Sequence, residues 1–196
     1  MPASRDLAER LVFLRGYLRA PGAVGSVTPS SLSLGRRMAR LAHVDRAASV
    51  LELGAGTGSV TRALLEALPA GARLWAFEID GEFARGLRAR FDDPRLEVVE
   101  RSAADAPAVM ERAGVRAVDA VVSALPFSLL GRDVSRSVLD AAARVMRPGA
   151  ALVALQYNPW YLAPLLRERF GTLERRLWLW NLPPAVLLRA HAPGPR

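Results

Sequence analysis

The chain contains no cysteine and no lysine. Without cysteine, neither disulfide bonds nor thiolate metal sites can form. The longest apolar runs, around residues 117–130 and 149–157, are interrupted or shorter than the roughly 20 residues that a membrane-spanning helix needs. The N-terminal residues lack the apolar block and cleavage site of a secretory signal peptide. These absences predict a cytoplasmic protein that is either free or bound to a membrane face.

The composition is that of a globular domain with an excess of positive charge. Half of the 196 residues are apolar (51%) and about a quarter are charged (23%), which excludes a disordered chain. The length fits one domain, 1–196. The net charge of +8 is carried by arginine alone. We attribute the lack of lysine mainly to codon preference, but the positive charge itself predicts an anionic partner, either nucleic acid or an acidic membrane.

Short apolar runs alternate with helical patterns from residue 49 onward. Because such strands alternate with helices, the pattern predicts a parallel sheet covered on both faces. Residues 1–42 are expected to form two helices before a core over 43–196, and the last two strands to pair antiparallel. The predicted strands are 49–53, 73–79, 95–100, 117–125, 150–157, 172–180 and 185–192, and the predicted helices between strands are 59–68, 80–91, 106–113, 132–145 and one beginning after 157.

A glycine-rich loop, LELGAGTGS over 51–59, follows the first predicted strand. Ligands of such sheets bind where the strands end, so this loop is the expected binding site. A dinucleotide fingerprint would place its third glycine at Ser59, but here it is Gly58. Glu52 precedes the loop, and Glu78 ends the second strand, where a carboxylate can accept hydrogen bonds from both ribose hydroxyls of an adenosine.

At these residues the sequence resembles the class I S-adenosylmethionine (SAM)-dependent methyltransferases. Their E/D-x-G-x-G-x-G motif is matched over residues 52–58, and their ribose-binding acid by Glu78. The resemblance implies a Rossmann-like α/β fold with a seven-stranded, mostly parallel sheet, whose last strand is antiparallel. It also implies SAM as the cofactor. The residues expected to line the cofactor site are Glu52, Gly54, Ala55, Gly56, Gly58, Glu78, Ile79, Ser102, Ala103 and Ser123.

The segment SALPF, residues 123–127, resembles the N/D/S-x-x-P-Y/F turn with which amino-methylating enzymes position a nitrogen. The resemblance implies that Ser123 and the Leu125 carbonyl accept hydrogen bonds from the amine, and that Phe127 packs beside the methyl-receiving group. An ordinary turn between a strand and a loop is the alternative. At the position that contacts adenine in many relatives the chain has Ser102 in place of an acidic residue, with Asp105 three residues later.

Two further stretches, 13–39 and NLPPAVLLRAH over 181–191, resemble the bacterial phospholipid N-methyltransferases of the soluble, membrane-associating type. The resemblance extends over nearly the whole chain. It implies stepwise methylation of phosphatidylethanolamine, through the mono- and dimethyl lipids, to phosphatidylcholine. The expected partner is an anionic phospholipid membrane, and the expected location is the inner face of the cytoplasmic membrane.

The N-terminal region carries an apolar stripe edged with arginine. On a helix over about 5–19, four leucines share one face and two arginines flank it, which suits a helix lying in the membrane interface. Docking of the same face on the protein's own sheet is the alternative. The residues of this membrane-binding prediction are Leu7, Arg10, Leu11, Leu14, Arg15 and Leu18.

Other residues add less. Tyr17 and Tyr157 are candidates to orient the head group, because methylated ammonium groups suit aromatic walls. His43 and His191 lie outside the expected site, and we interpret both as structural. The sequence offers no cluster of metal ligands and no catalytic Ser/His/Asp set. Two alternative functions stay open, an RNA adenine N-methyltransferase and a non-catalytic SAM-fold module that binds lipid.

Overall fold

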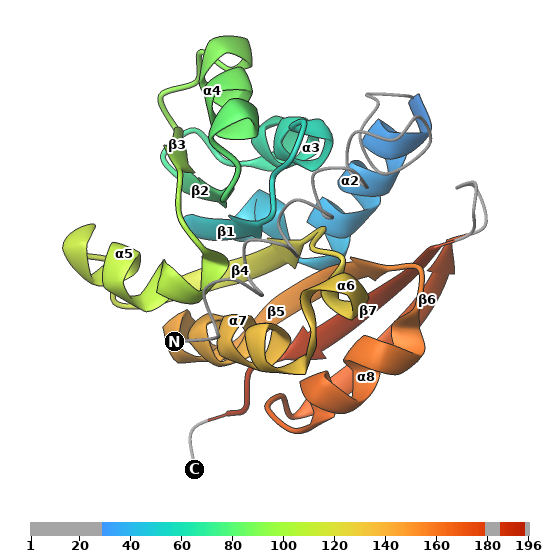
Figure 1. Ribbon diagram of the computed structural model, residues 1–196. Helices are drawn as coiled ribbons and strands as arrows, with labels where there is room; N and C mark the ends of the chain where they lie inside the picture. The colour runs from blue at the N-terminus through green and yellow to red at the C-terminus, as the bar shows by residue number, and fades with distance from the viewer. Residues whose placement is uncertain (1–28, 179–184, 195–196) are drawn as a thin grey trace, which may run out of the picture.

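The computed structural model describes residues 29–178 and 185–194. One seven-stranded sheet lies between two layers of helices (Figure 1). The strand order is β3-β2-β1-β4-β5-β7-β6. The elements are α2 (Pro29–Leu41), η1 (Val44–Arg46), β1 (Ser49–Leu53), α3 (Ser59–Ala67), β2 (Arg73–Phe77), α4 (Gly81–Arg90), β3 (Leu96–Val99), η2 (Ala103–Asp105), α5 (Ala106–Arg112), β4 (Val118–Ser123), α6 (Phe127–Leu130), α7 (Arg132–Val145), β5 (Met146–Gln156), α8 (Pro159–Arg167), β6 (Thr172–Trp178) and β7 (Ala185–His191).

Strands β1 to β5 are parallel, and β7 runs antiparallel between β5 and β6. This confirms the predicted Rossmann-like sheet with its antiparallel final strand. Because β7 is antiparallel to both neighbours, β6 runs in the same direction as β5. The carboxyl ends of β1, β2, β4, β5 and β6 therefore share one edge of the sheet, which we call the carboxyl edge.

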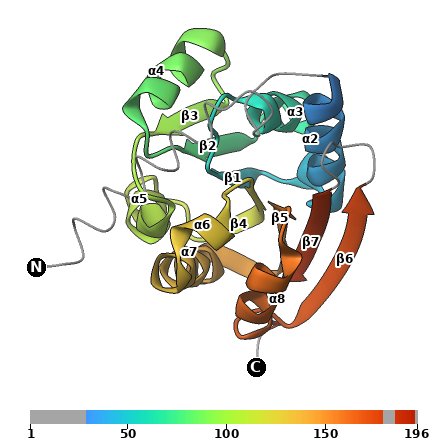
Figure 2. The same cartoon turned by 45° about the vertical axis from the view of Figure 1, so that its right-hand side comes forward.

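Each face of the sheet is covered by its own apolar core. On one face, β-strand side chains such as Leu53 and Phe77 pack with residues of α5, α7 and α8. On the other face, side chains such as Val50 and Leu74 pack with those of α2 and α3. The two views agree on this division of the helices (Figures 1 and 2). Burial on both faces explains why these strands are almost continuously apolar.

Helix α2 is packed into the domain. Leu34 and Met38 are buried in the core beneath α3, and a β-carbon at Gly35 would lie 2.8 Å from the Ala63 Cβ. Only a residue without a side chain allows the two helices to approach this closely. From Pro29 onward, the region expected as an extension is therefore part of the packed fold.

Strand β5 differs from the prediction at its start, because it begins at Met146 and not at residue 150. The sequence RPG at 147–149 reads as a turn, yet the chain stays paired there. Val118 pairs with Met146 and Ala120 with Ala151, so an irregularity in the ladder absorbs the extra residues. Gly149 has a φ of +75°, which suits such a bulge.

Candidate functional site

The glycine loop leaves the carboxyl end of β1 and enters α3. The N–H groups of Gly54 and Ala55 both donate to the carbonyl of Phe77, at 2.9 and 3.1 Å, which ties the loop to the end of β2. Gly54, Gly56 and Gly58 have φ values of +79°, +54° and +84°. Residues with side chains rarely adopt this backbone, so the loop needs glycine for its path.

The three glycines meet different surroundings. A β-carbon at Gly54 would lie 2.5 Å from the Leu125 side chain, and one at Gly58 would lie 2.6 Å from the ring of Phe91. At Gly56, by contrast, no heavy atom of the described chain lies within 4 Å of that position. The outer glycines are thus required by packing inside the protein, whereas the middle one borders open space that a ligand can fill.

Glu78 is buried (5% exposed) beside this space. Its Oε2 accepts a hydrogen bond from the Gly56 N–H at 2.8 Å, and its Oε1 accepts one from the Asp80 N–H at 2.8 Å. Burial raises the pKa of Glu78, although these two hydrogen bonds oppose the shift. Each carboxylate oxygen can accept a second hydrogen bond, so Glu78 retains the capacity to bind two ribose hydroxyls.

Glu52 is fully buried at the end of β1. Its Oε2 accepts a hydrogen bond from the Thr61 hydroxyl at 2.7 Å, while its Oε1 has no hydrogen-bond partner among the described residues. Burial raises the pKa of Glu52 from its usual 4.5 to about 8, and the charge of Glu78 adds to the shift. A buried carboxylate oxygen without a partner is costly, so this atom is suited to a cationic or N–H donor from a ligand.

These features fit SAM. Glu78 can accept hydrogen bonds from the ribose, and the unpartnered oxygen of Glu52 can accept one from the amino group. The open space at Gly56 leaves room for the cofactor beside the glycine loop. Ile79 follows Glu78 and is 39% exposed, as a residue packing against a purine would be. The individual contacts predicted for these residues stay predictions.

Two further residues predicted for the cofactor site, Ser102 and Ala103, differ from each other. Ser102 caps η2, where its hydroxyl accepts a hydrogen bond from the Ala104 N–H at 3.2 Å. The side chain of Ala103 is buried in the core between η2, α5 and α7. A contact between Ala103 and a cofactor would therefore involve its backbone.

The SALPF segment connects β4 to α6 and is tightly bonded to its neighbours. The Ser123 hydroxyl donates to the Leu53 carbonyl and accepts from the Leu125 N–H, both at 3.3 Å. The Leu125 carbonyl accepts from the Gln156 amide at 2.9 Å and from the Phe127 N–H at 2.9 Å. Phe127 itself is fully buried in the core.

This geometry bears on two of the predicted roles, which stay predictions. The Leu125 carbonyl already accepts two hydrogen bonds, so an incoming amine would have to replace one of these donors. Phe127 has no exposed ring face to present to the acceptor. Ser123 is buried in the same network, and its contact to an amine stays a prediction.

Sequence analysis missed Gln156, the last residue of β5. It is buried (3% exposed), and its amide N–H groups donate to the carbonyls of Leu125 and Leu155. A polar residue that ends an apolar strand at the carboxyl edge was the signal that could have identified it. Tyr157 comes next and is 36% exposed, close to the segment that Gln156 holds. Tyr17 and the residues predicted to bind the membrane lie outside the described residues; the latter are Leu7, Arg10, Leu11, Leu14, Arg15 and Leu18.

No three His, Asp or Glu side chains of residues 29–178 and 185–194 are grouped so that they could hold a metal ion. Within the same residues, no helix has the length and apolar character required to cross a membrane.

Comparison with known proteins identifies the relatives of this chain. A family model described as "Methyltransferase domain" matches residues 50–149. The chain is 30% identical over 175 residues to an ornithine lipid N-methyltransferase of Singulisphaera acidiphila, and the match covers 89% of this chain and 91% of that protein. A ribosomal RNA small subunit methyltransferase A of Caulobacter vibrioides is 40% identical over 100 residues, which is half of this chain but only 36% of that protein.

The solved structures agree on the fold. N-methyltransferase NodS from Bradyrhizobium japonicum, in complex with S-adenosyl-L-homocysteine, superimposes with a TM-score of 0.70 at 16% identity, over 94% of this chain and 98% of that one. TrmN from Thermus thermophilus gives a TM-score of 0.65 at 18% identity, over 89% of this chain and 53% of that one. At these identities the likeness concerns the fold alone.

Proposed function

The chain belongs to the SAM-dependent methyltransferases, and from that premise we propose that it methylates the primary amine of a membrane lipid, phosphatidylethanolamine being the expected acceptor. The observation that carries the proposal is the near full-length similarity to a lipid N-methyltransferase. The expected products are the mono- and dimethyl lipids and finally phosphatidylcholine. The reaction would take place at an anionic membrane surface on the cytoplasmic side.

Each residue of the carboxyl edge is proposed to contact a different part of the cofactor or the acceptor. SAM, when bound, supplies a methyl group activated by a sulfonium. Gly56 provides the space for it, Glu78 holds the ribose, and Glu52 accepts from the amino group. Gln156 fixes the Leu125 carbonyl and with it the wall of the site next to Tyr157. Holding the reacting groups in line is the main contribution of the protein to such a transfer.

The acceptor amine must arrive without its proton. The buried groups at this edge favour the neutral amine, because removal from water disfavours the ammonium form. Tyr157, exposed beside Gln156, is the described aromatic residue that we expect to face the growing methylammonium group.

Exposed apolar side chains flank the same edge and support docking on a bilayer. Trp160 is 74% exposed and Leu177 is 63% exposed, and the guanidinium of Arg175 lies over the Trp160 ring at 5.0 Å. Leu177 pairs with Val186, which pairs with Gln156, so this patch is level with the end of β5. Tryptophan and arginine together suit the interface between lipid and water.

A second acceptor is favoured by the same comparison. The full-length relative is named for ornithine lipid, whose head group also carries a primary amine. Methylation of ribosomal RNA is the third candidate, because the net charge is +8 and the matches to rRNA methyltransferases are significant. Those matches span about a third of the relatives' length, and this leaves the RNA candidate with less support than the lipid one.

The test is methyl transfer from labelled SAM. The protein is incubated with phosphatidylglycerol vesicles that contain phosphatidylethanolamine, and separately with deproteinised ribosomal RNA. We expect mono-, di- and trimethylated lipid to appear in sequence on thin-layer chromatography. Label that enters RNA but not lipid, under conditions in which the protein floats with the vesicles, would contradict the proposal.

A further inference from the structure

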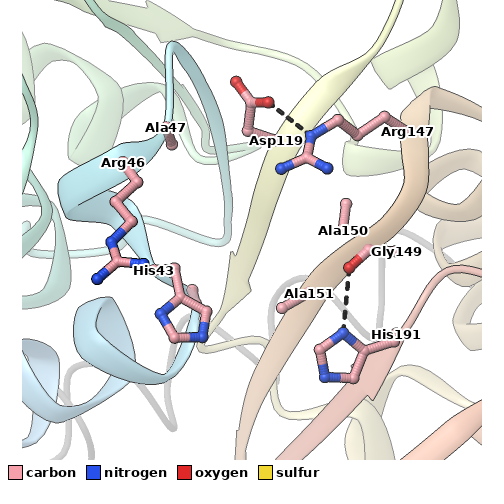
Figure 3. Close-up of a pocket in the computed structure, with 10 residues that line it drawn as sticks. His43, Arg46, Ala47, Asp119, Arg147, Gly149, Ala150, Ala151 and His191 are labelled. Carbon is pink, nitrogen blue, oxygen red and sulfur yellow. Dashed lines mark hydrogen bonds and ion pairs between the residues drawn. The ribbon is translucent and has the colours of Figure 1, made fainter.

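A cleft of about 220 Å³ lies at the edge of the sheet opposite the carboxyl edge. It is bordered by η1 and the turn before it, by the first residues of β4 and β5, and by the last residue of β7 (Figure 3). None of the residues predicted for the cofactor or the acceptor lines it. The cleft is smaller than the roughly 300–1,000 Å³ of typical organic-ligand pockets, so its size suits a small ligand.

Both histidines of the protein line this cleft, although 148 positions separate them in the chain. Each imidazole is held by a hydrogen bond. His43 Nε2 accepts from the Arg189 guanidinium at 2.8 Å, and His191 Nδ1 donates to the Gly149 carbonyl at 3.1 Å. His43 is also the one non-glycine residue with a positive φ (+54°) in the described part of the chain. Strained backbone of this kind is concentrated at functional positions.

Two arginines complete the cleft. In Figure 3, Arg46 and His43 lie on one side, and Arg147 and His191 on the other. Behind His43, the Arg189 Nε is buried and has no hydrogen-bond partner among the described residues. Four basic side chains, from η1 and the turn before it, from β5 and from β7, therefore line one small space, and Arg189 supports one of them.

Carboxylates are present, but they leave donors unused. Asp119 accepts from the Ala48 and Ser49 N–H groups and, through its other oxygen, from the Arg147 Nε at 2.7 Å. Burial would raise the pKa of Asp119, but these hydrogen bonds outweigh it and lower the pKa, so Asp119 stays ionised. It uses only the Nε of Arg147 and leaves the two terminal nitrogens of that guanidinium for a ligand.

The other two carboxylates are more distant from the space. Asp45 lies 3.7 Å from the Arg46 Nε in a contact where both side chains are mostly exposed, and solvent weakens such a pair. Glu174 is shared between Arg176, at 3.0 Å, and Arg189, at 3.5 Å. The cleft as a whole is close to charge balance, and it offers N–H donors without matching acceptors.

We propose that this cleft binds a small phosphate-bearing anion, either orthophosphate or the phosphate group of a soluble phosphomonoester. Planar guanidinium groups grip phosphate oxygens through paired N–H donors, and arginine is the usual residue for this purpose. The cleft lies across the sheet from the expected membrane-facing edge, and this favours a soluble ligand over a lipid phosphate. The proposal is independent of the acceptor proposed above.

The experiment is calorimetric titration of the full chain with sodium phosphate against sodium chloride of equal ionic strength. We expect saturable binding of phosphate only. The double variant Arg46→Gln/Arg147→Gln should weaken it by about tenfold or more, since it removes both guanidinium groups and their charge-assisted hydrogen bonds to phosphate. Arg85→Gln, which removes an exposed arginine on α4, is the matched control and should bind phosphate like the parent. SAM affinity serves as the fold check for every variant.

A second variant keeps the test independent of the arginines. His43→Asn removes the imidazole but tolerates the left-handed backbone, so it should fold and bind phosphate several-fold more weakly. Flotation of the same variants with phosphatidylglycerol vesicles tests whether the phosphate that binds is soluble or belongs to a lipid. Loss of flotation without any orthophosphate titration would identify a lipid phosphate and overturn the soluble ligand. The site would be overturned if the parent bound neither orthophosphate nor the vesicles in a saturable way. It would also be overturned if the double variant bound them like the parent.

Discussion

Glu52 is the residue whose chemistry depends most on its surroundings. It is an acid enclosed in the core, one of its oxygens has no described partner, and its pKa of about 8 means that the unliganded protein holds it mainly protonated at neutral pH. A positively charged amino group beside it would favour the ionised form. The motif that identified the residue in the sequence gives its position, but the raised pKa follows from its burial in the packing around β1.

The first prediction concerns this pKa. Between pH 4.5 and about 8 the unfolded chain ionises Glu52 while the folded protein keeps it protonated. The free energy of unfolding contributed by Glu52 is therefore fully present below pH 4.5 and is lost as the pH rises toward 8, by roughly 3–5 kcal/mol in total. Glu52→Gln should remove this loss and weaken SAM binding. Urea unfolding of the unliganded protein over this pH range measures it, with the exposed Glu111→Gln as the control.

The result that would contradict this assignment is specific. If Glu52→Gln leaves the pH dependence of unfolding as it is in the parent, the buried carboxyl is already ionised. If it also binds SAM with the parent's affinity, the free oxygen of Glu52 has no role toward the cofactor.

The second prediction separates two glycines of the loop. Gly56→Ala meets only open space, so it should cost roughly 1–2 kcal/mol of folding stability for its left-handed backbone. It should nevertheless weaken SAM binding by at least about tenfold, because its methyl group takes up the ligand's space. Gly58→Ala would press on Phe91 and Leu87 and should destabilise the fold more. Thermal unfolding measures the stability of both variants, and calorimetry measures their SAM affinity. Equal SAM affinity in Gly56→Ala and the parent would argue against the site.

At the scale of elements, the sequence predicted most of the architecture. Helix α7 and strand β1 have their predicted bounds, because the apolar periodicity of each is clear and glycines mark where the helix begins and where the strand ends. The early start of β5 was missed, since local turn residues cannot show that a strand continues through them with a bulge while it stays paired to its neighbour. The short helix α6 was missed for a similar reason, as its four residues are set by the fold around Phe127.

For the site, the sequence predicted the motif residues but not the contacts between distant strands. Motif positions such as Glu78 follow from sequence, because a single strand end places them. Gln156 and its bond to the Leu125 carbonyl depend on two strands that are distant in the chain, and no local pattern reports such a contact. The burial of Phe127 reflects packing against α7 and α8, which the turn motif does not encode.

The third prediction concerns the patch formed by α8 and β6. Trp160→Glu and Leu177→Glu each replace an exposed apolar side chain at the carboxyl edge with a charge. We expect each to weaken flotation with phosphatidylglycerol vesicles by about tenfold, as transfer of one such side chain from water contributes roughly 1.5–3 kcal/mol. Ala113→Glu, at an exposed position after α5, adds the same charge elsewhere and should float like the parent. Parent-like flotation of both patch variants would mean that this edge does not touch the bilayer.

For the molecule as a whole, the apolar patch predicts which edge faces a membrane, and the net charge of +8 adds attraction to anionic lipid. A lipid head group projects only a short distance from the bilayer, so the carboxyl edge has to face it for transfer to occur. Apolar cores cover both faces of the sheet, and the glycine loop lies at the same edge as the exposed side chains of Tyr157 and Trp160. Catalysis and docking are therefore expected to share a surface.

The fourth prediction follows from that arrangement. Turnover on vesicles should require anionic lipid and should fall with added salt, because surface charges are screened over about 10 Å at 0.1 M. Leu11→Asp, which places a charge in the leucine stripe of the N-terminal sequence, should reduce vesicle binding while leaving SAM affinity unchanged. Co-sedimentation and calorimetry measure the two quantities. Turnover that is independent of both salt and anionic lipid would show that docking is not electrostatic.

The most direct test of the central claim is a competition between acceptors in one vessel. The protein receives SAM with a deuterated methyl group, vesicles that contain both phosphatidylethanolamine and ornithine lipid, and ribosomal RNA, and every acceptor is then analysed by mass spectrometry. We expect labelled mono-, di- and trimethyl forms of phosphatidylethanolamine, and their absence with the Gly56→Ala variant. Label found only in RNA would contradict a lipid methyltransferase, and label found only in ornithine lipid would contradict phosphatidylethanolamine as the acceptor.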